Sequence, residues 1–109
     1  MNGSAYVDTE REQAYEALLR ERVLSLCAGL PCTIYLFGSR ARKQARRSSD
    51  FDIGIEGLDA QTFRRLKIAL QDWLEESPIP HTIDVIDFSH ADPVFVIHVK
   101  KDAIIWKKS

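Results

Sequence analysis

The sequence predicts one α/β (α+β) domain, in which a small mixed sheet of three to four strands is flanked by helices. Two observations predict this fold. Short runs rich in β-branched and aromatic residues alternate with longer segments whose apolar residues recur at helical spacing. The chain has 109 residues, which fits a single domain (1–109) and argues against a second, substrate-binding lobe.

Each expected element follows from a local pattern. Gly29 and Pro31 are suited to end the first helix, Asp59 to cap a later one, and Asp92 before Pro93 to begin the last. The expected elements are, in chain order, a helix from Asp8 or Thr9 to about Leu26, a strand over Thr33–Phe37, a short exposed helix or loop over 40–47, a strand over Phe51–Ile55, a helix from Asp59 to about Leu74, a turn over 77–80, a strand over Thr82–Phe88, a helix from Pro93 to about Lys100 and a final edge strand or turn over Ala103–Trp106.

Composition and charge exclude several classes of protein. A net charge of −1 gives no bulk electrostatic reason to bind nucleic acid. No apolar stretch approaches the roughly 20 residues of a membrane helix, and the first residues lack the pattern of a secretory signal. Cys27 and Cys32 have no metal-like spacing, so we expect reduced, buried thiols in a cytoplasmic protein.

Asp50 and Asp52 are candidate metal ligands. They lie two residues apart at a predicted strand, so both side chains point to the face opposite Phe51 and Ile53. Two interpretations are open. Either that face is solvent and the acids only decorate it, or a divalent cation offsets their charge, because unpaired buried carboxylates are costly. Oxygen ligands favour Mg²⁺ or Mn²⁺ over zinc.

Asp84 is the candidate third carboxylate. It lies in the next strong strand, and a neighbouring strand can bring it beside Asp52. Three carboxylates could hold two metal ions for in-line phosphoryl displacement. Asp87 is less suited, because strand alternation puts it on the other face from Asp84. The simpler interpretation of Asp84 is an acid at a strand edge.

A Gly38-Ser39 turn precedes the acids and is a candidate phosphate-binding element. Glycine lets the backbone approach a ligand closely, and the Ser39 hydroxyl and nearby N–H groups can hold phosphate oxygens. A basic run follows the turn, and it is either a solvated helix face or in part a phosphate-binding segment. Its members are Arg40, Arg42, Lys43, Arg46 and Arg47.

The stretch FGSRAR followed by SDFDI resembles the signature of the DNA polymerase beta-like nucleotidyltransferase superfamily. The short chain and the Arg-Ala-Arg continuation resemble its minimal nucleotidyltransferase (MNT) subgroup, small prokaryotic proteins paired with helical HEPN partners. The resemblance spans about Thr33 to Phe88. It implies that Ser39 contacts the triphosphate, with Arg40 and Arg42 near the phosphates or the partner. It also implies metal binding by the three aspartates, whereas Lys43 stands where the family often has glycine.

By this resemblance we expect a Mg²⁺-dependent nucleotidyltransferase that moves AMP from ATP onto a hydroxyl, with release of pyrophosphate. The acceptor would lie on a HEPN partner, which would make the chain the antitoxin of a toxin–antitoxin pair. A non-catalytic module that neutralises its partner by contact and a small-molecule (antibiotic) nucleotidyltransferase are the alternatives.

Residues outside this signature bear on packing and assembly. The segment 94–99 has more apolar residues than one helix face needs, so we expect another subunit, identical or different, to cover part of it. His81, His90 and His98 are expected at the surface or in caps, and Trp73 and Trp106 in the core or an interface.

Overall fold

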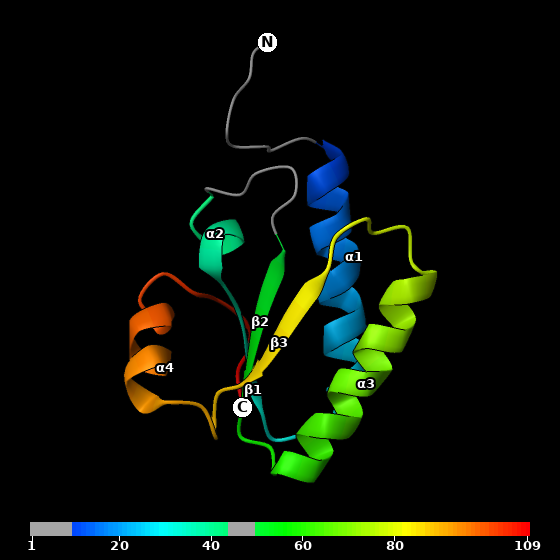
Figure 1. Ribbon diagram of the computed structural model, residues 1–109. Helices are drawn as coiled ribbons and strands as arrows, with labels where there is room; N and C mark the ends of the chain where they lie inside the picture. The colour runs from blue at the N-terminus through cyan, green and yellow to red at the C-terminus, as the bar shows by residue number, and fades with distance from the viewer. Residues whose placement is uncertain (1–9, 44–49) are drawn as a thin grey trace.

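The computed structural model describes residues 10–43 and 50–109, and in them a mixed four-stranded sheet is flanked by helices (Figure 1). This arrangement confirms the expected fold class. The elements are α1 (Glu10–Leu26), β1 (Thr33–Phe37), α2 (Gly38–Ala41), β2 (Phe51–Glu56), α3 (Ala60–Glu76), β3 (Ile83–Asp87), α4 (Pro93–Lys100) and β4 (Ile104–Lys107). The expected cap at Asp8 or Thr9 lies outside the described residues.

The strand order is β3-β2-β1-β4, so β1 and β2 form the centre of the sheet. β1 runs antiparallel to both of its neighbours, β2 and β4, whereas β2 and β3 are parallel. A parallel pair needs a long crossover, and α3 supplies it. The final residues, which the sequence left open between edge strand and turn, form the edge strand β4.

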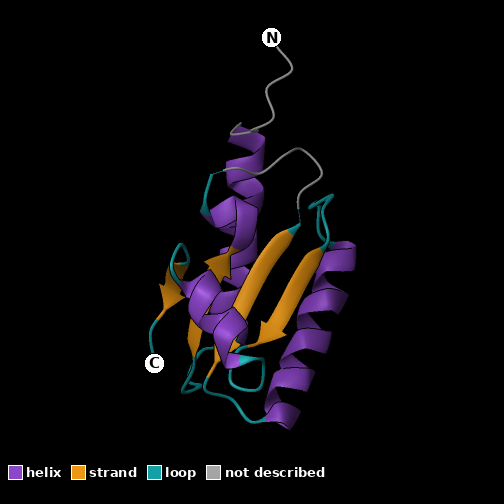
Figure 2. Cartoon of the chain, turned by 60° about the vertical axis from the view of Figure 1, so that its left-hand side comes forward, coloured by secondary structure: helices purple, strands orange, loops and turns teal. Residues whose placement is uncertain are grey.

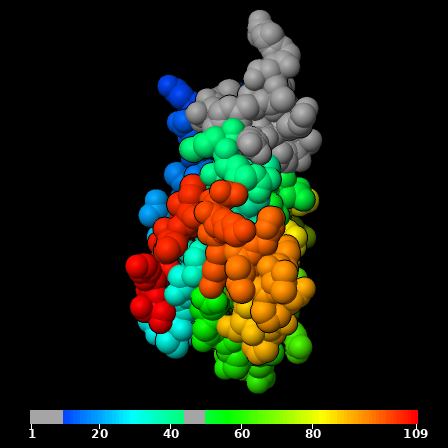
Figure 3. Space-filling view, turned by 90° about the vertical axis from the view of Figure 1, so that its left-hand side faces the viewer, coloured from blue at the N-terminus to red at the C-terminus, as the bar shows by residue number. Residues whose placement is uncertain are grey.

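The helices cover the two faces of the sheet unequally (Figure 2). α1 and α3 pack on one face and build the main core with the strands. The opposite face carries α4 and a smaller cluster around Phe37, Phe88 and Val96. Figure 3 shows this second side of the molecule, where α4 and β4 lie below α2. No helix in the described residues has the length and apolar character needed to cross a membrane.

Local signals in the sequence mark the starts of α3 and α4 correctly. The Asp59 side chain accepts a hydrogen bond from Thr62 N at 2.7 Å, and Asp92 accepts one from Val94 N at 3.1 Å. Each bond satisfies an N–H group that the first turn of a helix would otherwise leave without a partner. Trp106 is buried in the main core, and Trp73 packs against that core.

The two cysteines meet at the corner between α1 and β1. Both are free and fully buried, as expected. Burial, and then the neighbouring Cys32 thiol, raise the pKa of Cys27 to about 12.

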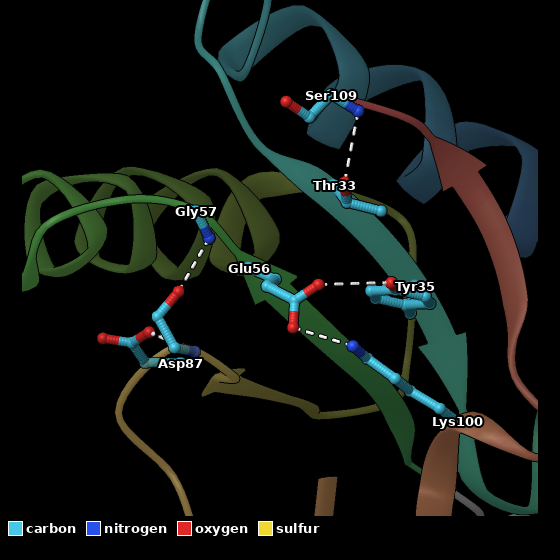
Figure 4. Close-up of polar contacts among 8 residues, drawn as sticks. Thr33, Tyr35, Glu56, Gly57, Asp87, Lys100 and Ser109 are labelled. Atoms are coloured by element: carbon cyan, nitrogen blue, oxygen red, sulfur yellow. Dashed lines mark hydrogen bonds and ion pairs between the residues drawn. The ribbon is translucent and has the colours of Figure 1, made fainter. Parts of the chain in front are cut away.

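Polar contacts fix α4 to the sheet (Figure 4). Lys100 Nζ donates to Glu56 Oε2 at 2.7 Å, and the Tyr35 hydroxyl donates to Glu56 Oε1 at 3.3 Å. Directly after β2, Gly57 N donates to Ser89 Oγ at 2.7 Å. The Lys100–Glu56 ion pair is about one third exposed on each side, so it orients α4 while contributing at most about 1 kcal/mol.

Gly54 in β2 lies against the ring of Phe88, and a Cβ added at this position would overlap the ring atoms. We therefore expect Gly54→Ala to lower the free energy of unfolding by about 1–3 kcal/mol in a denaturant titration. Phe88→Leu shortens the side chain and provides the matched background. There, the added penalty of Gly54→Ala should be largely lost. Equal stability of Gly54→Ala and wild type would contradict this packing.

Candidate functional site

Gly38 brings the end of β1 into direct contact with the carboxylate of Asp52. The strand register pairs Phe37 with Asp52, so the next residue turns beside that side chain. Gly38 has φ of +77°, and a Cβ at this position would overlap Asp52 Oδ2. Only glycine permits both the backbone conformation and this close approach. The half-buried Ser39 follows directly, so the expected phosphate turn lies next to one of the expected metal ligands.

Asp52 and Asp84 are neighbours across the parallel β2–β3 pair. Phe51 and Ile53 on one strand, and Ile83 and Val85 on the other, are buried in the main core. Strand alternation therefore places both aspartates on the opposite face, the one that carries α4. The register confirms that a sheet neighbour brings Asp84 beside Asp52, and a shared role in metal binding remains a prediction.

Burial and charge repulsion in the site act on the carboxyl group of Asp52. Asp50 and Asp84 are exposed, whereas Asp52 is half-buried. Burial, and then the negative charges of Asp84 and Asp50, raise the pKa of Asp52 to about 6, and Arg42 acts in the opposite direction. A cation bound between these oxygen donors would relieve the repulsion. The donor set therefore fits a magnesium or manganese ion.

A hydrogen bond from Thr82, the residue before β3, holds the side chain of Asp50. Thr82 Oγ1 donates a hydrogen bond to Asp50 Oδ1, and Phe51 N donates to the Thr82 carbonyl at 3.1 Å. Within residues 10–43 and 50–109, no three acidic, histidine or cysteine side chains already form a metal cluster. Asp50, Asp52 and Asp84 lie at the same end of the sheet, but their carboxylates are not already gathered into a metal-binding cluster. A carboxylate has enough lone pairs to accept from Thr82 and still ligate a metal.

Arg40 lies in the interior, which corrects the expectation of an exposed segment after the Gly-Ser turn. Its side chain is only 4% exposed, and Nη1 donates to Glu12 Oε1 at 2.8 Å. The guanidinium carbon lies 4.2 Å from the centroid of the Phe51 ring. Ala41 is buried as well. The expected contact of Arg40 with phosphate finds no support in this geometry.

The rest of the basic run divides into two parts. Arg42 and Lys43 are exposed, and the charge of Arg42 acts on Asp52, which keeps Arg42 a candidate phosphate ligand. Lys43 has φ of +60°, a conformation that favours glycine, which gives a physical reason for the glycine often found there in the family. Arg46 and Arg47 lie outside the described residues.

Sequence reasoning missed two residues at this site, Glu12 and His81. The expectation that His81 lies at the surface or in a cap is wrong. The His81 side chain is 7% exposed, and its Nε2 lies 2.9 Å from Glu12 Oε1. No local pattern signals this contact, because its partners are 69 positions apart. His90 and His98 are exposed, as expected.

Comparison with known proteins identifies the class. Residues 30–109 match the family described as polymerase beta, nucleotidyltransferase, and the chain belongs to that family. It is also similar, at 30% identity and a TM-score of 0.61, to a candidate minimal nucleotidyltransferase, over 93% of this chain and 98% of the other. No curated protein matches the chain.

Two toxin–antitoxin complexes share the fold at lower identity. A toxin–antitoxin structure with AMP-PNP has a TM-score of 0.63 and 23% identity, over 83% of this chain and 73% of the other. A complex of a tri-AMPylated HEPN toxin of Shewanella oneidensis with its MNT antitoxin has a TM-score of 0.60 and 21% identity, over 86% and 73%.

The raised pKa of Asp52 predicts a pH-dependent cost to stability. The carboxyl group shifts from an ordinary value of 3.8 to about 6 on folding, so the folded protein binds more protons between these values. The ionised Asp52 carboxylate destabilises the folded state. This destabilisation is absent below the window from 3.8 to about 6, grows as the pH rises through it and is complete above it. Allowing for solvent screening, we expect Asp52→Asn to raise the metal-free free energy of unfolding by about 1–2 kcal/mol near pH 7.5.

The measurement is a urea titration at several pH values in the presence of a chelator. Near pH 4 the gain from Asp52→Asn should be much smaller, because the wild-type carboxyl group is then neutral in the folded state and only partly ionised in the unfolded state. Asp72→Asn, at an exposed position on α3, is the matched control and should show no such dependence. A gain that is the same at both ends of the pH range would contradict the assignment.

Proposed function

We propose that this chain is a Mg²⁺- or Mn²⁺-dependent nucleotidyltransferase that transfers AMP from ATP to a hydroxyl group on a HEPN-type helical protein, and that it is the antitoxin of that pair. The observation that carries the proposal is the contact of Gly38 with Asp52, which in turn is paired with Asp84. In a chain of the nucleotidyltransferase family, a Gly-Ser turn beside two carboxylates supports binding of phosphate and metal at this point of the sheet.

Each residue has a defined part in the proposed reaction. The acceptor oxygen attacks the α-phosphorus, the bond to the oxygen that bridges to the β-phosphate breaks, and pyrophosphate leaves. Gly38, Ser39 and Arg42 bind the phosphate chain, and an Asp84 carboxylate oxygen accepts the proton of the acceptor. A metal ion held by Asp50, Asp52 and Asp84 would offset phosphate charge and lower the pKa of the attacking hydroxyl.

The choice of AMP and of a HEPN partner is supported by the neighbours in fold, one with AMP-PNP and one with an AMPylated HEPN toxin. An exposed apolar surface supports a protein partner. Val94, Phe95 and Ile97 on α4 are 73%, 40% and 65% exposed, on the same side of the sheet as Asp52 and Asp84. A subunit that covered α4 would bring its acceptor to the face that carries the acids.

The compartment and domain organisation complete the proposal. Two buried free thiols suit the reducing cytoplasm. The described elements contribute to one sheet and its flanking helices, which supports a single nucleotidyltransferase domain over 1–109.

Transfer of label from [α-³²P]ATP to a co-expressed HEPN protein tests the enzymatic role. We expect transfer that needs Mg²⁺ or Mn²⁺ and that falls by about 100-fold or more in Asp52→Asn and Asp84→Asn, because both substitutions remove charge that the metal site requires. The folded state of both variants should persist by circular dichroism. Asp72→Asn, at an exposed position on α3, which packs on the opposite face of the sheet from the acids, should transfer label like wild type.

Other outcomes would point to the alternatives. A wild-type protein that binds and neutralises its partner without transferring label, and variants that do so equally well, would favour a module that acts by contact. Transfer to an antibiotic and none to a protein would favour a small-molecule enzyme.

A further inference from the structure

The carboxylate of Glu12 on α1 holds two segments that are far apart in the chain. Arg40 Nη1 donates to Glu12 Oε1 at 2.8 Å, and His81 Nε2 lies 2.9 Å from the same oxygen and 3.2 Å from Oε2. All three side chains are largely buried, with 11% of Glu12 exposed and less of the other two. Burial acts to raise the pKa of Glu12, but the contacts with Arg40 and His81 hold it below its ordinary value.

Phe51 completes this cluster. Its ring lies below the guanidinium of Arg40, and the His81 ring meets it edge-on, with centroids 5.9 Å apart. Phe51 is fully buried and stands between Asp50 and Asp52 in the chain. Glu12, Arg40, His81 and Phe51 are called the Glu12 clamp below.

The first arm of the clamp, the contact between Glu12 and Arg40, is connected to the phosphate turn. Arg40 follows Gly38 and Ser39 directly, within the single turn of α2. A guanidinium fixed by Glu12 and by the Phe51 ring therefore fixes the backbone of that turn. Since Gly38 lies against the Asp52 carboxylate, a small shift of α2 would change the contact between the turn and the acid.

The second arm, the contact between Glu12 and His81, is connected to the aspartates. His81 is followed by Thr82, whose hydroxyl donates to Asp50 and whose carbonyl accepts from Phe51 N. β3, with Asp84, begins at the next residue. Holding His81 therefore sets both the hydrogen bond to Asp50 and the start of the strand that carries Asp84.

We propose that Glu12, Arg40 and His81 are positioning residues, which lock the phosphate turn to the aspartates so that the two halves of the site keep their relative position. In this proposal Arg40 positions the phosphate turn and does not itself bind phosphate. α1 thereby also has a part in the reaction without any contact to substrate. The inference rests on the proposed nucleotidyl transfer for its kinetic consequences, but not for its structural ones.

The kinetic test compares Glu12→Gln, Arg40→Gln and the double variant in the AMP-transfer assay. Loss of positioning about the reacting atoms typically costs about 10- to 100-fold, so we expect a fall of that size in kcat in each single variant, with the KM for ATP within about threefold of wild type. The double variant should fall no further than the worse single variant, because Glu12→Gln already weakens the contact through which Arg40 acts. Glu21→Gln, exposed on the same helix, is the matched control.

The double variant is also a control for loss of activity through misfolding. Glu12→Gln alone leaves the charge of Arg40 in the interior, whereas the double variant removes both charges together. An Arg40→Gln variant with a KM for ATP raised tenfold or more, beside a Glu12→Gln variant with wild-type kinetics, would show that Arg40 binds phosphate and would overturn the proposal.

Hydrogen exchange on the nucleotide-free protein tests the clamp independently of any activity. The Arg42 amide donates to Gly38 O at 3.2 Å and the Phe51 amide to Thr82 O at 3.1 Å, so each reports on one arm. We expect both to exchange about tenfold or more faster in Glu12→Gln than in Glu21→Gln, while the Ile53 amide in the centre of the sheet is unchanged. Equal exchange in the two variants would overturn the clamp. Faster exchange without any AMP transfer by wild type would overturn the proposed function alone.

Discussion

The central strand β2 must satisfy two opposite requirements, and the rest of the structure depends on how it does so. One face of the strand is dry, with Phe51, Ile53 and Ile55 almost completely buried against α1 and α3. The other face carries Asp52 and Gly54. A slip of one residue in register would send the acids into the core and the apolar side chains toward solvent, so burial of one face fixes the position of the other.

Both neighbours of β2 use this fixed position. β1 arrives antiparallel and ends where Gly38 meets Asp52, while β3 arrives parallel and places Asp84 beside the same residue. Asp52 is therefore the point at which two separate pairings converge, and it combines partial burial with two like charges nearby. The site owes its geometry to sheet register more than to any loop.

The features that could be predicted from the sequence are those with a local cause. Alternation in the segment Phe51–Ile55 indicates which residues share a face, and Asp59 caps its helix through an atom three residues away. The neighbour relation of Asp52 and Asp84 could be expected because strands in succession often pair. The position of β4 beside β1 could not be read in this way, since it depends on a contact between the first and the last strand in the chain.

Arg40 and His81 show where local reasoning fails. In the sequence, Arg40 is one of several basic residues in an apparently solvated run, and His81 follows a proline in a turn. Both are buried because a single carboxylate on α1 compensates them, 28 and 69 positions away in the chain. A polar side chain is buried only where a partner exists, and the partner is a property of the tertiary structure. For Lys43, the left-handed backbone conformation was likewise invisible in composition.

The paired thiols at the corner of α1 and β1 have a practical consequence for how the molecule can be observed. Alkylating reagents attack the thiolate, and a fully buried Cys27 with a pKa of about 12 offers almost none. Covalent labelling of the native chain should therefore proceed only through transient opening of this corner. The rate of modification then measures how often this corner opens, a quantity that neither melting nor turnover reports.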